Sequence, residues 1–197
     1  ANHSNWWDGF IAYLLTNRTL KKDDYLMMDI EQMRKYSFFK YIGAFSVDRN
    51  VPIEAVRSLN YAANLLNKSD KYMWIFPQGE MHPQDRRPLK FFSGITKITE
   101  KINNVNLVPV CFRYEFLKEQ RPEVFISIGK PGIISGEIRG DLTESLRSIL
   151  ESQLDKLKEN VTSGNTLTFK TIFTGKNSRN KTFDKKALLF ALAILKA

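Results

Sequence analysis

The chain has 197 residues, of which 43% are hydrophobic and 26% are charged, and it carries a net charge of +9 at pH 7. Its apolar content is sufficient for a sizeable core, which excludes a disordered chain, and its one cysteine, Cys111, excludes an internal disulfide. The excess of basic residues favours anionic partners such as phosphates, acidic lipids or nucleic acids.

The first half of the chain alternates helical patterns with short apolar runs. A helix is predicted directly after Asp8, because apolar residues recur there at helical spacing. We also predict strands at residues 25–28, 44–47 and 72–76, and helices at residues 31–40 and 52–66. Pro52 suits the first turn of the last of these helices, where a missing N–H is tolerated.

The second half continues this alternation after a polar, proline-rich loop at residues 78–93. We predict a helix at residues 94–103, strands at residues 107–112 and 124–128, and a helix that begins at Asp141 and continues through Leu157. The last helix starts with Asp141-Leu-Thr-Glu144, which resembles a capping box.

A polar and basic stretch follows, and near its end lies an apolar run of nine residues, 187–195. A bilayer-spanning helix needs about 20 apolar residues, so this run predicts a short packed or interfacial helix. We interpret residues 161–197 as a basic C-terminal extension that carries this short apolar helix.

The alternation of strands and helices predicts an α/β fold, with a mixed β-sheet flanked by helices in a single domain over residues 1–160. The chain has no initiator Met, and its first residues already belong to the motif described next, so we expect a truncated N-terminus. In such folds the functional residues lie on loops beyond the strand ends.

His3 and Asp8 are the candidate catalytic residues. A neutral imidazole can take a proton from a hydroxyl at pH 7, and a nearby carboxylate can fix its tautomer and stabilise the imidazolium that forms. Five positions apart on one helix, the two side chains would point about 140° apart. The pair therefore requires His3 in a loop and Asp8 near the start of a helix. A histidine that merely caps this helix is the structural alternative.

Three later segments strengthen the pair. They are Gly-Ala-Phe-Ser-Val-Asp-Arg at residues 43–49, Phe-Pro-Gln-Gly-Glu at residues 76–80 and Val-Pro-Val at residues 108–110. Together with Asn2-His3-x4-Asp8, their order and spacing resemble the four sequence blocks of the glycerolipid acyltransferase family, the lysophosphatidate-acyltransferase-like proteins.

The resemblance implies an O-acyltransferase that moves a fatty acyl group from a thioester to a hydroxyl of a glycerolipid such as 1-acylglycerol-3-phosphate. The acyl donor would be acyl-CoA or acyl-carrier protein, with no further cofactor, and His3 would act as general base with Asp8. No metal is expected, since His82 and Asp85 lack metal-ligand spacing. The resemblance assigns six residues to substrate binding: Arg49, Gly43, Phe76, Pro77, Gly79 and Glu80.

The chemistry of three of these residues supports that assignment. Arg49 follows a predicted strand and can hold a phosphate bidentately, although an ion pair with Asp48 or another carboxylate is the alternative. Gly79 permits a close backbone approach, and N–H groups near it could stabilise an oxyanion. For Glu80 three interpretations stay open: it holds the loop, it contacts the acceptor, or it is an ordinary surface carboxylate.

The sequence also departs from the family pattern. Gln78 stands where the family has Glu, and Glu80-Met81 stand where it has Thr-Arg, so a second phosphate-binding arginine is missing. Either a cation from the loop, Arg86, Arg87 or Lys90, takes its place, or the acceptor is a non-phosphorylated glycolipid or carotenoid sugar.

Two further features have core packing as their simpler interpretation. Residues 108–110 line the acyl cleft or belong to an ordinary core, since a proline in a strand pattern indicates a strand end, an edge or a bulge. Cys111 lies in an apolar run without a neighbouring histidine, so we interpret it as a core residue and not as a nucleophile.

Aromatic residues suited to a membrane interface are Trp6, Trp7, Phe38, Phe39 and Tyr41, with core packing as the alternative. With the positive charge they predict binding to an anionic membrane surface at its cytoplasmic face, either peripherally or through an anchor outside this chain. A basic lipid-binding module without catalysis is the competing class. Nucleic acid is not expected, because no recognised binding motif is present.

Overall fold

The computed structural model describes residues 1–67, 71–102, 104–117, 121–135, 141–174 and 191–195. Its contacts divide the chain into two compact units. Unit 1 comprises Ala1–Leu107 and Pro131–Ser148, and unit 2 comprises Val108–Lys130 and the chain from Ile149 onward. Helices combined with parallel and antiparallel strands confirm the predicted α/β class. The domain boundary at residue 160 stays a prediction.

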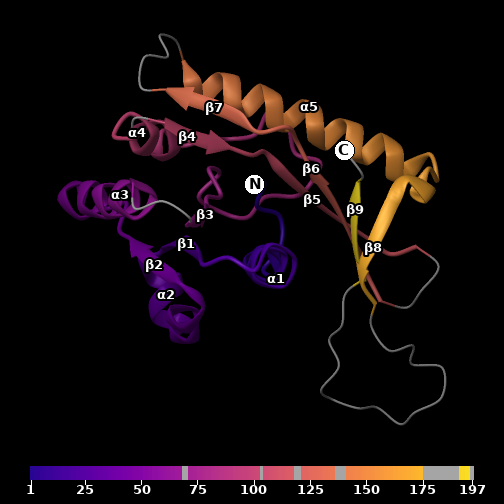
Figure 1. The fold of residues 1–197 in the computed structure, drawn as a ribbon, viewed down its shortest axis with the longest axis horizontal. Helices are drawn as coiled ribbons and strands as arrows, with labels where there is room; N and C mark the ends of the chain where they lie inside the picture. The colour runs from indigo at the N-terminus through magenta and orange to yellow at the C-terminus, as the bar shows by residue number, and fades with distance from the viewer. Residues whose placement is uncertain (68–70, 103, 118–120, 136–140, 175–190, 196–197) are drawn as a thin grey trace. The chain divides into compact units, whose positions relative to one another are not determined.

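Unit 1 contains a three-stranded parallel sheet in the order β2-β1-β3 (Figure 1). Its strands are β1 (Asp24–Asp29), β2 (Ala44–Val47) and β3 (Tyr72–Trp74). The central strand β1 has apolar residues at Leu26, Met27 and Met28 between an aspartate at each end. In the register of β1 and β2, Asp29 lies beside Val47. The carboxyl ends of these two strands therefore meet at one edge of the sheet.

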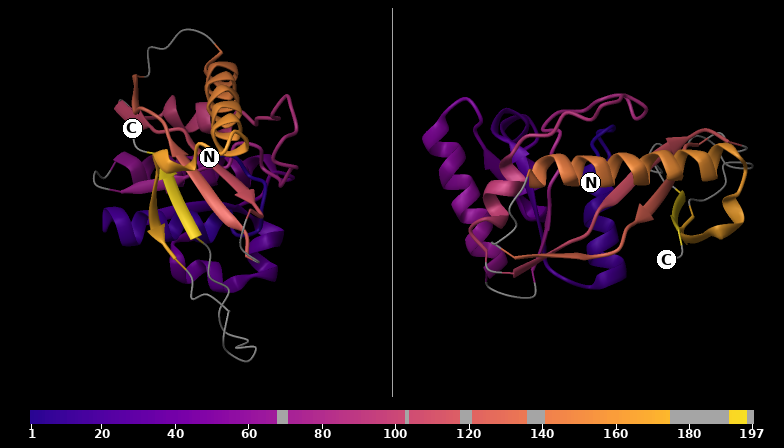
Figure 2. Two further views of the ribbon diagram at one scale, coloured as in Figure 1. Left: turned by 90° about the vertical axis from the view of Figure 1, so that its right-hand side faces the viewer. Right: turned by 90° about the horizontal axis from the view of Figure 1, so that it is seen from above.

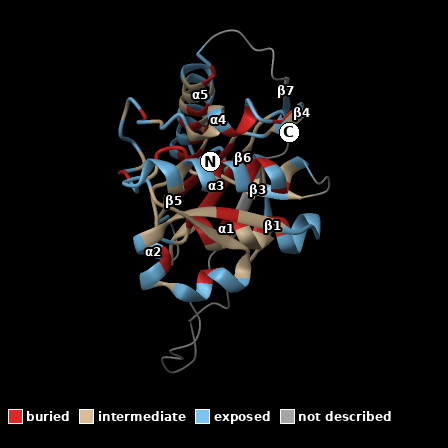
Figure 3. Cartoon of the chain, turned by 90° about the vertical axis from the view of Figure 1, so that its left-hand side faces the viewer, coloured by how far each residue is buried: buried red, intermediate tan, exposed pale blue. Residues whose placement is uncertain are grey.

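Two helices cover the sheet with a shared core. Helix α3 (Pro52–Asn67) contributes Leu59, Ala62 and Ala63, and helix α4 (Gly94–Thr99) contributes Ile98. Met27 of β1 packs against this core. In Figure 3 the buried residues lie inside the unit, and exposed residues lie on the outer turns of its helices.

The remaining elements of unit 1 are short. They are α1 (Asp8–Leu14), the π-helical segment η1 (Leu15–Leu20), α2 (Ile30–Lys35), the 3-10 helix η2 (Ser37–Ile42), and the antiparallel strands β4 (Asn104–Leu107) and β7 (Gly132–Ser135). The side chain of Asp29 caps α2 by accepting a hydrogen bond from the backbone N–H of Glu31 at 2.9 Å.

Several predicted boundaries are wrong. The helix predicted at residues 31–40 ends at Lys35, because Tyr36 leaves the helical conformation before η2 begins. The strand predicted at residues 72–76 ends at Trp74, ahead of the turn around Pro77. The helix predicted at residues 94–103 ends at Thr99.

The strand predicted at residues 107–112 is in fact two strands in different sheets. Strand β4 ends at Leu107, and strand β5 begins at Val110. Pro109 lies between them, and because proline has no N–H to donate, it interrupts the hydrogen-bonded ladder.

Unit 2 contains a four-stranded sheet in the order β5-β6-β9-β8. Its elements are β5 (Val110–Glu115), β6 (Glu123–Ile128), η3 (Thr166–Thr168), β8 (Phe169–Phe173) and β9 (Ala191–Leu195). Helix α5 (Leu142–Thr162) begins in unit 1, and its unit 2 part runs beside β6 (Figure 2), where Gln153 Nε2 donates a hydrogen bond to the Ser127 carbonyl at 2.9 Å. The predicted N-cap is present, since Asp141 accepts a hydrogen bond from the Glu144 N–H at 3.1 Å.

Residues 191–195 form a strand and not the predicted helix, while residues 187–190 of that run lie outside the described residues. Strand β9 pairs with β6 on one side and β8 on the other. Pairing on both sides satisfies its backbone, whereas an isolated helix of this length is marginal. Among the residues that the structure describes, we find no helix whose length and apolar character would let it cross a membrane.

Candidate active site

The candidate site lies in unit 1, where the chain leaves the three parallel strands. Asp29 ends β1, Arg49 follows β2 by two residues, and Phe76 follows β3 by two residues. Because these strands are parallel, their carboxyl ends share one edge of the sheet, which is where α/β folds place their sites.

His3 and Asp8 are paired as their spacing predicted. His3 lies in the loop before α1, Asp8 is the first residue of α1, and His3 Nδ1 is 2.9 Å from Asp8 Oδ2. The Asp8 side chain is fully buried, whereas the His3 side chain is 24% exposed. The loop therefore turns the two residues toward each other, which one continuous helix would not allow.

The Asp8 carboxylate is fixed by the backbone as well as by His3. Asp8 Oδ2 accepts hydrogen bonds from the N–H groups of Ser4 at 2.8 Å and Asn5 at 2.9 Å. Because the carboxylate is an acceptor, the arrangement assigns the imidazole proton to His3 Nδ1 and leaves a lone pair on Nε2. This is the tautomer that a general base requires.

The segment from Phe76 to His82 holds the backbone of His3. The His3 N–H donates to Gln78 Oε1 at 2.7 Å, and the His3 carbonyl accepts from the His82 N–H at 3.0 Å. The His3 ring also stacks on Phe76 with its centroid 4.8 Å away. Gln78, which is only 2% exposed, is a positioning residue that sequence reasoning missed. In the sequence, this residue was marked only by its departure from the family pattern, which has Glu at this position.

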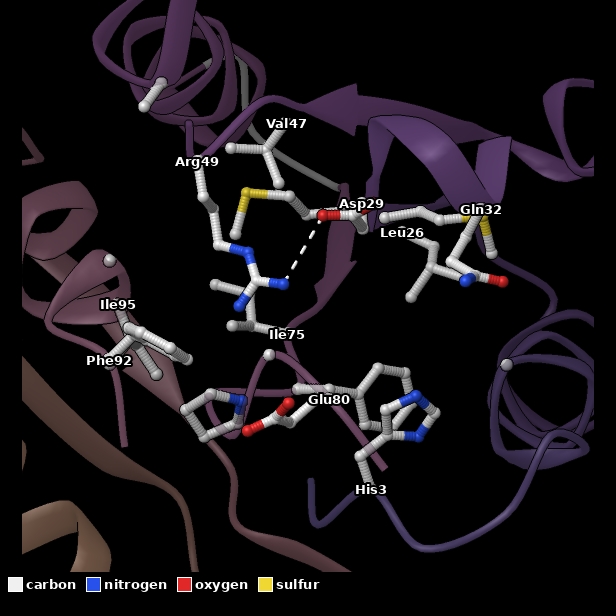
Figure 4. A pocket seen from close by; sticks show the side chains of 18 of the residues that line it. His3, Leu26, Asp29, Gln32, Val47, Arg49, Ile75, Glu80, Phe92 and Ile95 are labelled. Atoms are coloured by element: carbon white, nitrogen blue, oxygen red, sulfur yellow. Dashed lines mark hydrogen bonds and ion pairs between the residues drawn. The ribbon is translucent and has the colours of Figure 1, made fainter. Parts of the chain in front are cut away.

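A cavity of about 660 Å³ adjoins His3 (Figure 4). Of the predicted site residues, those that line it are His3, Arg49, Phe76, Pro77, Gly79 and Glu80. Asp8 is buried behind His3. Gly43 lies elsewhere, at the turn before β2, where φ is +82°. A Cβ added at this position would lie only 2.3 Å from the Asp24 carbonyl oxygen. Close packing against β1 accounts for this glycine.

Much of the cavity wall is apolar. The apolar lining residues on the strands and helices that form it include Leu26, Met27, Met28, Val47, Leu59, Ile75 and Ile95. Their hydrophobic patterns marked them as core in the sequence. Whether such residues face a packed core or an open cavity depends on how the strands and helices pack, so the sequence carried no separate signal for the cavity.

Arg49 projects into this cavity from the loop after β2. Its Nη2 is 3.4 Å from Asp29 Oδ2, and its guanidinium lies 5.0 Å from the centroid of the Phe92 ring (Figure 4). A Cβ at residue 79 would lie 2.5 Å from Arg49 Nη1, and the backbone there has φ +68°. Glycine at this position therefore gives Arg49 its space. The predicted carboxylate partner of Arg49 exists, although it is Asp29 and not Asp48.

The loop after Phe76 uses its polar groups internally. The Gly79 N–H donates to the Phe76 carbonyl at 3.0 Å, so this amide serves the turn. Glu80 Oε1 is 3.5 Å from both Lys90 Nζ and His82 Nε2.

The three loop cations that could have replaced the missing arginine have other contacts. Arg86 contacts His82 Nδ1 at 3.1 Å, Arg87 donates to the Gln84 and Arg86 carbonyls, and Lys90 lies 5.0 Å from the Phe92 ring centroid. The second cation that lines the cavity is Lys97 of α4, which the sequence did not single out.

Residues 108–110 belong to unit 2, where Val110 is buried and Val108 is exposed. Their contact with an acyl chain stays a prediction. Cys111 is fully buried, with Sγ 3.8 Å from the Leu150 carbonyl, as expected for a core residue. Within the described ranges, no group of His, Cys, Asp and Glu side chains is arranged to hold a metal ion.

The structure thus combines an α/β sheet with a buried carboxylate, a partly exposed imidazole and an adjoining cavity with a largely apolar wall. The Acyltransferase family model matches residues 1–113, more than half of the chain, and the chain belongs to this family.

A similar protein is the 1-acyl-sn-glycerol-3-phosphate acyltransferase of Streptococcus pneumoniae, which is 24% identical over 168 residues. The alignment covers 81% of this chain and 59% of that protein.

Proposed function

We propose that this protein transfers a fatty acyl group from a thioester to a lipid hydroxyl, with His3 as the general base. The observation that carries this proposal is the His3–Asp8 pair, with Nδ1 and Oδ2 2.9 Å apart beside an apolar cavity. Membership of the Acyltransferase family supports it. The donor is acyl-CoA or acyl-carrier protein.

In the proposed reaction, the acceptor hydroxyl oxygen attacks the thioester carbonyl carbon. His3 Nε2 takes the hydroxyl proton as the new C–O bond forms, and Asp8 stabilises the resulting imidazolium. The C–S bond then breaks, and the proton passes from His3 to the departing thiolate. The substrate oxygen is the nucleophile, so no covalent acyl-enzyme is required.

The acceptor in this proposal is a glycerolipid. The name of the Streptococcus pneumoniae relative gives 1-acylglycerol-3-phosphate as the acceptor of that protein. Here Arg49 is the residue that could hold a head group, and the apolar wall formed by residues such as Leu26 and Ile75 suits an acyl chain.

The test is acyl transfer by the purified protein. Labelled acyl-CoA or acyl-carrier protein is mixed with a panel of lipid acceptors that includes 1-acylglycerol-3-phosphate, and esterified products are counted. We expect product that requires His3. Lipid binding with no ester product on any acceptor would contradict the proposal and favour the non-catalytic lipid-binding module instead.

We also propose that unit 1 binds an anionic membrane surface. Trp6, Trp7, Phe10, Tyr36, Phe38 and Phe39 form an aromatic cluster of contacting rings. Trp6 and Phe38 of this cluster are 36% and 41% exposed, and nearby Tyr41 is 91% exposed.

Two features relate the aromatic cluster to membrane binding. Arg34, Lys35 and Lys40 lie in the last turns of α2 and η2, where they would attract acidic lipids. Trp6, Tyr36 and Phe39 also line the cavity, so a lipid leaving the membrane would enter beside the aromatic cluster.

Vesicle co-sedimentation tests this membrane contact. We expect binding to vesicles with acidic lipid that weakens as salt rises, because salt screens the attraction. Replacing Lys35 and Lys40 with Gln should weaken binding roughly tenfold or more, at about 1 kcal/mol per cation. The control is Lys101→Gln with Lys156→Gln, which removes the same charge elsewhere. Equal, salt-insensitive binding to neutral and acidic vesicles would contradict the proposal.

A further inference from the structure

The charge of the cavity differs from the charge of the chain. The acidic residues that contribute to its lining are Asp29, Glu31 and Glu80, and the basic residues are Arg49 and Lys97. Acidic residues of the lining thus outnumber basic ones by three to two, although the whole chain carries +9. An excess of positive side chains favours the binding of a phosphate dianion. This lining has no such excess.

The contacts of Arg49 and Lys90 further reduce the positive charge that is available to a ligand. Arg49 is already paired with Asp29 at 3.4 Å, so part of its charge is neutralised before any ligand enters. Lys90 adds a cation near the cavity, but it is 3.5 Å from Glu80, and counting it only makes the charges balance.

Glu80 lies at the cavity with two basic side chains of its own loop near its carboxylate. Its Oε1 is 3.5 Å from Lys90 Nζ and 3.5 Å from His82 Nε2, and its side chain remains 52% exposed. In Figure 4, Glu80, Arg49 and His3 project into the same cavity. An ionised carboxylate only accepts hydrogen bonds, so it attracts hydroxyl donors and repels phosphate oxygens.

We infer that the acceptor is a lipid with an uncharged, hydroxyl-rich head group, such as the sugar of a glycolipid, and that Glu80 selects it. One hydroxyl of the head group gives its proton to His3 and becomes the ester oxygen. A neighbouring hydroxyl donates a hydrogen bond to Glu80. Gln32 and Asn50, whose amides bind hydroxyls readily, also line the cavity. The inference rests on the proposed acyl transfer and names its substrate class.

The experiment compares kcat/KM for three acceptors with one acyl donor. The acceptors are a monoglucosyl diacylglycerol, lysophosphatidate and a monoacylglycerol. For the unchanged chain we expect the glycolipid to exceed lysophosphatidate by at least about tenfold, the scale of one charge-assisted hydrogen bond. Lysophosphatidate used as well as the glycolipid, or better, overturns the inference and leaves the proposed function intact.

The variant Glu80→Gln tests the role of the carboxylate itself. It keeps the size of the side chain and removes its charge. We expect kcat/KM to fall about tenfold for the glycolipid and to rise for lysophosphatidate. The matched control is Glu54→Gln, which removes a surface carboxylate of α3 that pairs with Arg57 and should leave the ratio unchanged. An equal change of both acceptors by Glu80→Gln overturns the selective role. Transfer to none of the three acceptors overturns the proposed function, and this inference with it.

Discussion

His3 and His82 lie in neighbouring segments that are joined by the hydrogen bond from the His82 N–H to the His3 carbonyl. Their rings nevertheless have opposite partners. His3 Nδ1 faces the Asp8 carboxylate at 2.9 Å, whereas His82 Nδ1 faces the Arg86 guanidinium at 3.1 Å. An ionised carboxylate only accepts hydrogen bonds, whereas a guanidinium only donates them.

The partners therefore assign different tautomers to the two histidines. His3 has its proton on Nδ1 and a lone pair on Nε2. His82 Nδ1 accepts a hydrogen bond from Arg86, which leaves its proton on Nε2, 3.5 Å from Glu80 Oε1. His82 is also 9% exposed, compared with 24% for the His3 side chain. His3 also lines the cavity, whereas His82 is not among the lining residues. The partner of Nδ1 and the position at the cavity therefore both mark His3 as the histidine that can act as a base.

The largest expected effect is that of removing the base. We expect His3→Ala to lower the rate of acyl transfer by at least about 100-fold, the usual scale for the loss of a general base. Initial rates with labelled acyl thioester measure this loss, and circular dichroism checks that the variant is folded. A folded His3→Ala protein with a near-normal rate would show that His3 is not the base.

The second-largest effect is expected when Asp8, whose carboxylate sets the His3 tautomer, is replaced. Asp8→Asn keeps the size of the side chain but cannot stabilise an imidazolium, so we expect a rate loss of more than about tenfold, roughly 1.4 kcal/mol of transition-state stabilisation. If the rate of acyl transfer does not change, Asp8 serves only the local fold.

The carboxylates Asp8 and Asp24 offer a similar comparison, because their surroundings differ. Asp8 is buried with hydrogen bonds, whereas Asp24 is half-buried, and burial raises its pKa from 3.8 to about 6. The folded chain then binds this proton more tightly than the unfolded chain. This contribution to stability is present below about pH 4 and is lost as pH rises through about 6.

We therefore expect Asp24→Asn to raise the free energy of unfolding at pH 7 by about 1 kcal/mol, after allowance for solvent screening. Urea unfolding at pH 4 and pH 7 measures the change. Glu100→Gln, at an exposed carboxylate, is the control that should leave the pH dependence unaltered. A larger gain for Asp24→Asn at pH 4 than at pH 7 would contradict the sign of this effect.

A smaller effect is expected for the second histidine. His82→Gln should change the acyl-transfer rate by less than about threefold, since Gln can still accept a hydrogen bond from Arg86 and the backbone bond to His3 remains. The measurement is the same rate assay used for His3→Ala. A loss as large as that of His3→Ala would show that the assignment of the base is wrong.

The smallest effect is expected for Cys111, the alternative nucleophile in the chain. Its thiol is fully buried, with Sγ near the Leu150 carbonyl. We expect Cys111→Ala to leave turnover within about twofold and to lower stability by about 1 kcal/mol through the small cavity it creates. Mass spectrometry of the protein during turnover provides the check, because an acyl group trapped on Cys111 would rule out direct transfer.

The sequence predicted the elements whose patterns are strong and local. Strands at residues 25–28 and 44–47, the helix that begins at Pro52, and the turn that pairs His3 with Asp8 are all present. The short apolar run near the end of the chain was wrongly predicted to be helical, because its pairing with β6 and β8 is not visible in its own residues.

What the sequence determined by itself were patterns that depend on neighbouring residues: hydrophobic period, proline breaks and the short His3–Asp8 spacing. What only the tertiary structure decided are contacts between distant segments. Gln78 holds His3 across 75 positions, and Asp29 meets Arg49 across 20 positions because parallel strands bring their ends together. Such pairs depend on how the chain folds back on itself. The charge balance of the cavity follows from that folding and not from the composition of the chain.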